Sequence, residues 1–246
     1  MIPRSKLNEG GKVMNQMLRS HSKGGVVLRL FGGALSIWAG ASLLGLLITH
    51  FLAPSRMSFL DRGADTWLAS HRSTRLNTLT SWASSLSNTR TMILLTLIFI
   101  IFLRLKLKRW HESIFLLTVM GGELVIFLAI ALTVNRARPA VLKLDAAPPT
   151  SSFPSGHTSA AMALFGALAV LLLSEWGSLF WRRIFATLLF AIPVVVALAR
   201  VYRGMHYPSD VLAGALSAGL WLLIARKTLF SGQATLPALK ITRSKK

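Results

Sequence analysis

The feature that most constrains this chain is a series of six long apolar runs. They occupy residues 27–52, 91–107, 113–135, 158–174, 183–200 and 210–229. A helix needs about 20 apolar residues to cross a hydrocarbon core about 30 Å thick. Because lipid offers no hydrogen bonds to the backbone, runs of this length predict helices. We therefore expect an all-α fold, a polytopic membrane helical bundle with six transmembrane helices.

Composition supports this expectation over its alternative, a soluble helical protein with very apolar core helices. Hydrophobic residues make up 53% of the 246 residues, more than a soluble domain of this size can bury. The second run is the least regular, because Arg90 and Arg104 shorten it and must extend toward the headgroups. The chain contains no cysteine, which excludes disulfides, thiolate metal sites and cysteine nucleophiles.

The formal net charge of +20 follows the expected topology. If the N-terminus is cytoplasmic, most basic residues fall on the cytoplasmic side, as the positive-inside rule requires. These residues are Arg4, Lys6, Lys12, Arg19, Lys23, Arg29, Arg104, Lys106, Lys108, Arg109, Arg182, Arg183, Arg226, Lys227, Lys240, Arg243, Lys245 and Lys246. The charge therefore indicates orientation and attraction to membrane lipids, with no need for nucleic acid as a partner.

We expect a multi-pass protein of the cell membrane with both termini in the cytoplasm. Residues 1–26 form a basic cytoplasmic segment, residues 27–229 a single membrane domain, and residues 230–246 a basic cytoplasmic tail. The basic leader and first apolar run are too long for a typical signal peptide, so we interpret them as an uncleaved first span.

Three loops, residues 53–90, 136–157 and 201–209, then lie on the outer, periplasmic face. In the first, apolar residues recur at roughly helical spacing, which predicts one or two amphipathic helices at the interface. These residues are Phe59, Leu60, Trp67, Leu68, Leu76, Leu79, Trp82 and Leu86. The segment could form a roof or lateral gate over a site, or serve as an interfacial linker.

The second and third outer loops, together with Arg200 at the end of the span before the third loop, gather residues suited to a phosphate. Arg136, Arg138 and Arg200 can each donate paired hydrogen bonds to a tetrahedral anion. Pro154-Ser155-Gly156-His157 precedes a helical run, so free backbone N–H groups would face an anion there. Gly156 would let the backbone approach closely.

His206 and Asp210 are four residues apart in the sequence. Pro208 lies between them and is suited to the first turn of the sixth span, which places Asp210 in that turn. The aspartate can then reach back toward the imidazole. A carboxylate bonded to one ring nitrogen makes the other a better nucleophile, which leaves His157 to protonate the leaving group. The arginines would neutralise charge in the transition state.

At these positions the sequence resembles the type-2 phosphatidic acid phosphatase superfamily. Pro154 to His157 match the family's Pro-Ser-Gly-His motif. Its Ser-Arg-x5-His-x3-Asp motif is matched by Arg200, His206 and Asp210, with Ala199 in place of the serine. The Lys-x6-Arg-Pro motif is half present, because Arg138-Pro139 fits and Ala131 replaces the lysine.

The resemblance implies that His206 is the nucleophile, Asp210 its partner and His157 the general acid. It also implies that Arg138, Arg200, Ser155 and the Gly156 backbone hold the phosphate, and that no metal or cofactor is required. Arg136 or Lys143 could supply the charge of the missing lysine.

The predicted function is hydrolysis of a lipid phosphate or diphosphate through a phosphohistidine. By resemblance, candidate substrates are a polyprenyl diphosphate such as undecaprenyl diphosphate, phosphatidic acid and phosphatidylglycerol phosphate. A lipid phosphotransferase, and a non-catalytic lipid-phosphate binder or transporter suggested by Ala131 and Ala199, remain open. So do the lipid and the oligomeric state.

Two further patterns bear on the spans. Glu123 lies near mid-span, where an ionisable residue is costly; it is either functional or a neutral, bundle-facing acid. Small residues, which permit close helix packing, form stripes on the fourth and sixth spans. They are Ser159, Ala163, Ala167, Gly214 and Ala218.

Overall fold

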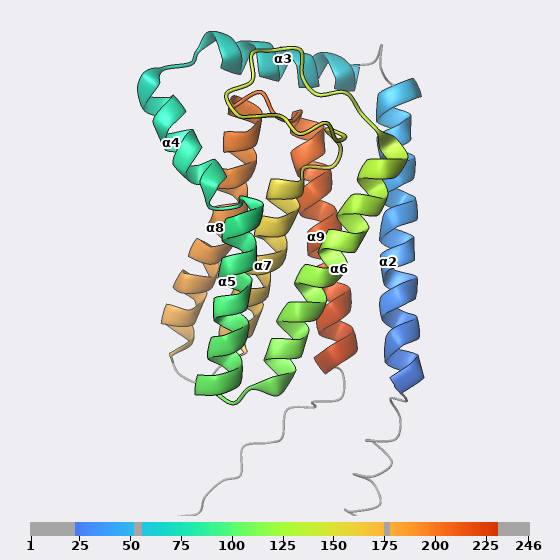
Figure 1. Cartoon of the computed structure of the whole chain (residues 1–246), viewed down its shortest axis with the longest axis vertical. Helices are drawn as coiled ribbons and strands as arrows, with labels where there is room; N and C mark the ends of the chain where they lie inside the picture. Colours follow the sequence, from blue (N-terminus) through green and yellow to red (C-terminus); the bar gives the residue numbers. More distant parts are fainter. Residues whose placement is uncertain (1–22, 52–55, 175–177, 231–246) are drawn as a thin grey trace, which may run out of the picture.

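The computed structural model describes residues 23–51, 56–174 and 178–230, and all regular secondary structure within these ranges is helical. Long helices run side by side along the molecule (Figure 1). In chain order they are α2 (Lys23–Leu46) continued by a π-helical turn η1 (Leu47–Phe51), α5 (Thr89–Ile101) continued by η2 (Phe102–Lys106), α6 (Trp110–Val134), α7 (Gly156–Leu173), α8 (Leu179–Tyr202) and α9 (Pro208–Phe230). Two shorter helices, α3 (Arg56–Ser70) and α4 (Thr74–Ser85), lie between α2 and α5 in the chain.

Five of the expected spans are confirmed as helices that are long and apolar enough to cross a membrane. They are Gly24–Phe51, Trp110–Val134, Gly156–Leu173, Leu179–Tyr202 and Pro208–Phe230. The second expected span, seen as Thr89–Lys106, meets this description only together with α4, from which it is bent by 47°. Arg90, Arg104 and Lys106 explain the difference, since they leave a short uncharged stretch. The all-α membrane bundle is thus confirmed, with five spans or six.

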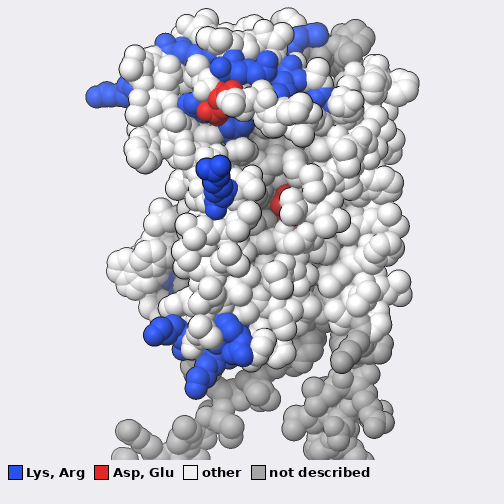
Figure 2. Space-filling model, viewed as in Figure 1, with Lys and Arg blue, Asp and Glu red and all other residues white. Residues whose placement is uncertain are grey.

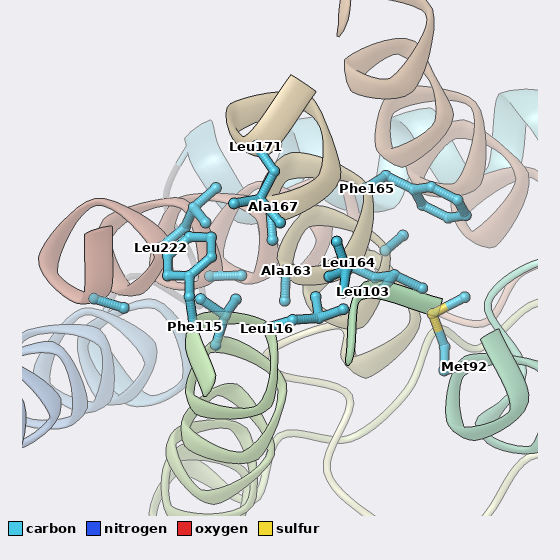
Figure 3. Packing of buried hydrophobic residues seen from close by; sticks show 14 of the residues in the cluster. Met92, Leu103, Phe115, Leu116, Ala163, Leu164, Phe165, Ala167, Leu171 and Leu222 are labelled. Atoms are coloured by element: carbon cyan, nitrogen blue, oxygen red, sulfur yellow. The ribbon is translucent and has the colours of Figure 1, made fainter. Parts of the chain in front are cut away.

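The interior of the bundle is built around α7. Its buried residues pack against α6 on one side and α9 on another (Figure 3). Phe115 and Leu116 of α6 and Leu164 of α7 belong to one apolar cluster, and all three are fully buried. Ala163 and Ala167 are also fully buried in this cluster, which confirms that the small residues of α7 permit close packing.

Two glycines mark the closest helix contacts. A Cβ at Gly122 of α6 would lie 2.1 Å from the Trp221 ring of α9, and one at Gly214 of α9 would lie 2.7 Å from the Ser155 carbonyl oxygen. The space at Gly122 lets the Trp221 indole N–H donate to the Val119 carbonyl, 3.1 Å away. Gly214 thus brings α9 against the start of α7.

The connections that carry the motif residues meet at one end of the bundle, drawn at the top of Figure 1. Helix α6 ends where Asn135 adopts a left-handed conformation with φ of 46°. Helix α9 begins at Pro208, as predicted. Helix α8 continues to Tyr202, so Arg200 lies in its last turn rather than in a loop. The expected span 183–200 therefore ends two residues too early.

The helical prediction for residues 53–90 is confirmed by α3 and α4, and α3 lies across the top of the bundle (Figure 1). Its apolar side chains Phe59, Leu60 and Trp67 are exposed, whereas Asp61 and Asp65 are buried toward the bundle. Arg72, after α3, donates to the carbonyl oxygens of Tyr202 and Leu142. We call α3 the roof helix, because it is attached to the bundle by polar contacts.

Lys and Arg side chains gather at the two ends of the molecule, with a broad surface of few charges between them (Figure 2). The lower group lies near the turn between η2 and α6, whose sequence carries Arg104, Lys106, Lys108 and Arg109. The start of α2 and the end of α9 lie at this same end (Figure 1). The expected terminal basic segments fall almost entirely outside the described residues.

Candidate active site

A cavity of about 980 Å³ joins the motif residues to the lipid-facing side of the bundle. At its polar end it is lined by Arg138, His157, Arg200 and His206. Its other walls are apolar residues of α5 and α6. They include Ile93, Leu97, Ile100, Leu117, Leu124, Leu128 and Leu132. Most of these side chains are also exposed on the outside of the bundle, so the cavity opens sideways between α5 and α6.

His206 is buried, and its hydrogen bonds define which ring nitrogen is free. Nδ1 lies 2.7 Å from the Ser152 carbonyl oxygen, which can only accept, so Nδ1 carries the proton. Nε2 therefore holds the lone pair, at 3.4 Å from Nη1 of Arg138. Burial, and then the positive charges of Arg200 and Arg138, hold the pKa of His206 well below its usual value. The ring is thus neutral with Nε2 available.

Asp210 is brought close to His206, but it does not make the direct hydrogen bond that the sequence predicted. Its Oδ2 lies 3.9 Å from His206 Nδ1, beyond hydrogen-bond length. The carboxylate instead accepts from Nη1 of Arg136 at 2.6 Å, from the Tyr207 backbone N–H at 2.9 Å and from the Ser152 hydroxyl. Ser152 therefore links the two residues, with its hydroxyl on Asp210 and its carbonyl on His206.

Arg138 and Arg200 line the cavity with donors left unused. Arg138 donates through Nη1 to the Met205 carbonyl at 2.8 Å, and Arg200 donates through Nη1 to the Ser84 hydroxyl at 2.7 Å. The Nε–H groups of both arginines are buried without a hydrogen-bond partner among the described residues. Burial lowers the pKa of Arg138, and Asp210 only partly offsets this effect. Orphaned donors of two cations favour an anion at this position.

Asp145, which the sequence did not single out, lies at the same end of the cavity. Its Oδ2 accepts from Arg200 Nη1 at 2.7 Å, and its Oδ1 accepts from Arg203 Nη2 at 2.6 Å. Burial raises the pKa of Asp145, but Arg203 and Arg200 more than offset this and hold it below its usual value. An ionised carboxylate thus occupies one edge of the Arg200 guanidinium.

Arg136 was predicted to bind phosphate, and its position contradicts that role. Its guanidinium is buried between Asp61 at 2.8 Å and Asp210 at 2.6 Å, and its Nη1 also donates to Ser209 Oγ at 2.7 Å. It stacks over the Tyr207 ring at 4.2 Å and does not line the cavity. Arg136 therefore fills an internal carboxylate network.

Ser155 was also predicted as a phosphate ligand and is likewise turned away from the cavity. It is fully buried, and its hydroxyl lies 3.0 Å from the Thr158 hydroxyl. Its backbone N–H donates to the Asp210 carbonyl at 3.0 Å. Gly156 and His157 do line the cavity at the start of α7, where backbone N–H groups have no helical acceptor.

His157 has a partner that was not predicted. Its Nε2 lies 3.1 Å from Oδ1 of Asn88, at the junction of α4 and α5. Asn88 lines the same cavity. No sequence pattern linked these two residues, which are 69 positions apart.

The place of the missing lysine remains without a basic substitute. Ala131 lines the cavity. Among the described residues, the only Lys or Arg side chains that line this cavity are those of Arg138 and Arg200. Lys143 is exposed and does not line it. The hypothesis that Arg136 or Lys143 replaces the lysine therefore has no support in the geometry.

Glu123 is buried and faces the bundle, where the Ser159 hydroxyl donates to its Oε1 at 2.5 Å. It lines the cavity deep between α5 and α6. Within the described ranges, no three His, Asp, Glu or Cys side chains cluster as a metal site would require.

Fold and site together define a class: a polytopic helical membrane protein with an arginine- and histidine-lined cavity at one end of its bundle. Residues 112–231 match the model of the PAP2 superfamily. This segment, which is thus similar to that superfamily, carries Arg138, His157, Arg200, His206 and Asp210.

Two curated relatives align with parts of the chain. Phosphatidylglycerophosphatase B of Bacillus subtilis is 30% identical over 125 residues, covering 49% of this chain and 58% of the relative. Lipid A 1-phosphatase of Rhizobium johnstonii is 36% identical over 80 residues, covering 32% of this chain and 28% of the relative. The alignments thus span less than two thirds of either relative.

Two solved structures share the fold. A PAP2-type phosphatidylglycerolphosphate phosphatase from Bacillus subtilis superposes with a TM-score of 0.65 at 22% identity, covering 86% of this chain and 97% of that one. LpxE from Aquifex aeolicus superposes with a TM-score of 0.56 at 24% identity, covering 68% of this chain and 95% of that one.

Proposed function

We propose that this protein is an integral membrane phosphatase that hydrolyses a lipid phosphate or diphosphate through a phosphohistidine at His206. The observation that carries the proposal is the shape of the cavity. Its polar end combines the orphaned Nε–H groups of Arg138 and Arg200 with the free Nε2 of His206. Its apolar walls open sideways toward lipid. A lipid with a phosphate headgroup suits both ends.

In the first step, Nε2 of His206 attacks phosphorus and forms a P–N bond. The P–O bond to the lipid breaks, its electron pair stays on the leaving oxygen, and His157 gives that oxygen a proton. The proton stays on Nδ1, which donates to the Ser152 carbonyl oxygen, and this hydrogen bond stabilises the ring as it gains positive charge.

In the second step, water replaces the lipid. His157, now neutral, takes a proton from the attacking water, the new P–O bond forms, and the P–N bond returns its electron pair to His206. Charge on the equatorial oxygens is neutralised by Arg138 and Arg200 and by backbone N–H groups at the start of α7, near Gly156. The chain's own residues supply every group used, and no metal enters these steps.

The names of the curated relatives support a lipid substrate, since they specify phosphatidylglycerophosphate and lipid A phosphatases. Phosphatidic acid, phosphatidylglycerol phosphate and a polyprenyl diphosphate are the substrates to compare. The basic residues near the η2–α6 turn and the end of α9 favour a cytoplasmic location for that end. The site would then face the outer side of the cell membrane.

The test is a panel of these lipids in vesicles with the purified protein, with release of inorganic phosphate as the measurement. Both His206→Ala and His206→Gln should abolish the release of inorganic phosphate. His206→Gln is included because glutamine is closer to histidine in size. Phosphate release that is undiminished in both variants would exclude the phosphohistidine mechanism.

A further inference from the structure

The junction between α4 and α5 forms one wall of the cavity, although it lies outside the segment that matches the PAP2 superfamily. Residues 84–89 are all lining residues except Leu86. Two of them contact the polar end directly: Ser84 accepts from Arg200 Nη1 at 2.7 Å, and Asn88 Oδ1 lies 3.1 Å from His157 Nε2. This wall therefore bears on both a phosphate-site arginine and the second histidine.

Asn88 uses its side chain in an unusual way. It is the N-cap residue of α5, a position where asparagine commonly accepts a hydrogen bond from the first turn. Here the side chain makes no capping bond. Its carboxamide oxygen is directed at His157 instead, and because that oxygen can only accept, Nε2 of His157 carries a proton.

The backbone at this junction is braced so that Asn88 is held in place. Helices α4 and α5 meet at an angle of 47°. The Thr91 hydroxyl of α5 donates to the Ser85 carbonyl of α4 at 2.9 Å, and the Ser87 hydroxyl donates to the Ser84 carbonyl at 3.3 Å. Helix α4 is in turn attached to α8, because Arg203 donates to the Asn77 carbonyl at 3.0 Å.

We infer that Asn88 is a positioning residue for His157. Its carboxamide oxygen fixes the plane of the His157 ring and stabilises the protonated form of His157, which donates a proton to the leaving oxygen. This inference rests on the proposed function and names a part of the same site that lies outside the family's motifs. When the lipid P–O bond breaks, the proton leaves His157 for the alkoxide oxygen. The imidazole that remains is neutral, and water restores its proton in the second step.

The experiment compares substrates that differ in their need for a general acid. Phosphatidic acid in mixed micelles has an alkoxide leaving group, which requires protonation, whereas p-nitrophenyl phosphate has a leaving group stable as an anion. Asn88→Ala should lower kcat on phosphatidic acid by about 10-fold or more, with a change of about 2-fold or less on p-nitrophenyl phosphate. His157→Ala should show the same selectivity with a larger loss.

Asn88→Asp is the matched rescue, because it keeps an acceptor oxygen at the same distance. It should restore kcat on phosphatidic acid to within about 3-fold of the unmodified protein. Arg90→Gln, at an exposed residue that does not line the cavity, controls for changes near the start of α5. Each variant is first checked for an unchanged elution volume and unfolding midpoint in detergent.

The outcomes separate the two proposals. The positioning role would be overturned if Asn88→Ala lowered kcat equally on both substrates. It would also be overturned if Asn88→Ala kept wild-type rates on both substrates while His157→Ala lost activity selectively. Either result would leave the proposed phosphatase function standing. Full activity of His206→Ala on both substrates would instead overturn the proposed function. Selective loss in Asn88→Ala with rescue by Asn88→Asp supports the inference.

Discussion

Arg136 and Asp210 form a buried ion pair, with Nη1 of the arginine 2.6 Å from Oδ1 of the aspartate. The pair extends to the roof helix, because Nη2 of Arg136 donates to Asp61 at 2.8 Å. Asp61 also accepts from the Ser209 backbone N–H at 3.0 Å, at the start of α9. The aspartate of the proposed catalytic motif is thus oriented from outside the cavity, by an arginine and a residue of the roof helix.

Arg136→Ala should destabilise the protein, since it leaves two buried carboxylates without their cation. Removing one partner of a buried ion pair costs about 3–5 kcal/mol. Thermal unfolding in detergent measures the effect, with Lys143→Ala at an exposed position as control. If both variants unfold like the unmodified protein, the internal role assigned to Arg136 is wrong.

Asp65 should make stability depend on pH. Burial, and then Asp61 and Asp210, raise its pKa from 3.8 to about 8. Between these values the folded state binds a proton that the unfolded chain releases, so this residue's contribution to stability is full below about pH 4 and declines as pH rises toward 8. Asp65→Asn should remove the decline and stabilise the protein most near pH 8. Parallel pH curves for the two proteins would contradict this prediction.

Arg138→Ala should weaken catalysis far more than folding, because Arg138 lines the polar end of the cavity and its buried Nε–H has no partner among the described residues. Loss of one such donor lowers kcat about 10²- to 10³-fold. Arg138→Lys should recover part of the charge but not the paired donors. The inhibition constant for orthovanadate, a phosphate analogue, should rise in parallel with the loss of rate; an unchanged constant would place the anion elsewhere.

Asp145→Asn should tighten the binding of inorganic phosphate. The carboxylate lies on Arg200 Nη1 at 2.7 Å and repels any anion that approaches the same guanidinium. Asparagine keeps an acceptor for Arg203 while removing the charge. Product inhibition by phosphate should therefore strengthen several-fold. Weaker inhibition would show that Asp145 mainly holds Arg200 in place.

Leu97→Trp should narrow the opening between α5 and α6, because Leu97 lines the cavity and is exposed on the outside of the bundle. We expect kcat/KM for long-chain phosphatidic acid to fall while the rate on p-nitrophenyl phosphate is preserved. Leu223→Trp, at an exposed position of α9 outside the cavity, is the control. Equal effects on both substrates would argue against lipid entry by this route.

The sequence predicted five spans to within a few residues, because hydropathy acts locally and each run is long enough to decide its own structure. It also predicted that Arg138, His157, Arg200 and His206 would converge, since their loops lie at one end of adjacent helices. It did not predict which way Arg136 and Ser155 turn. In an irregular loop, the direction of a side chain depends on its partners. The partner of Arg136 is Asp61, which lies 75 positions away in the sequence.

The residues missed by sequence reasoning share one property. Ser152, Asn88 and Asp145 each act through contacts with residues distant in the chain, and none has a motif of its own. A signal did exist for Asp145: it is the sole acidic residue in the connection between α6 and α7, which also carries Arg136, Arg138 and Lys143. A carboxylate alone among cations in a motif loop indicates an internal ion pair.

The roof helix has its polar face inward and its apolar face outward, the reverse of an ordinary surface helix. The Asp61–Arg136 ion pair fastens it below, and Phe59, Leu60 and Trp67 are exposed, as is typical of side chains that insert into a membrane interface. We expect the lipid headgroup region to cover these apolar side chains and so to stabilise the helix. Lipid composition, and the detergent chosen for purification, should then affect how firmly Asp61 and Arg136 hold Asp210 in place.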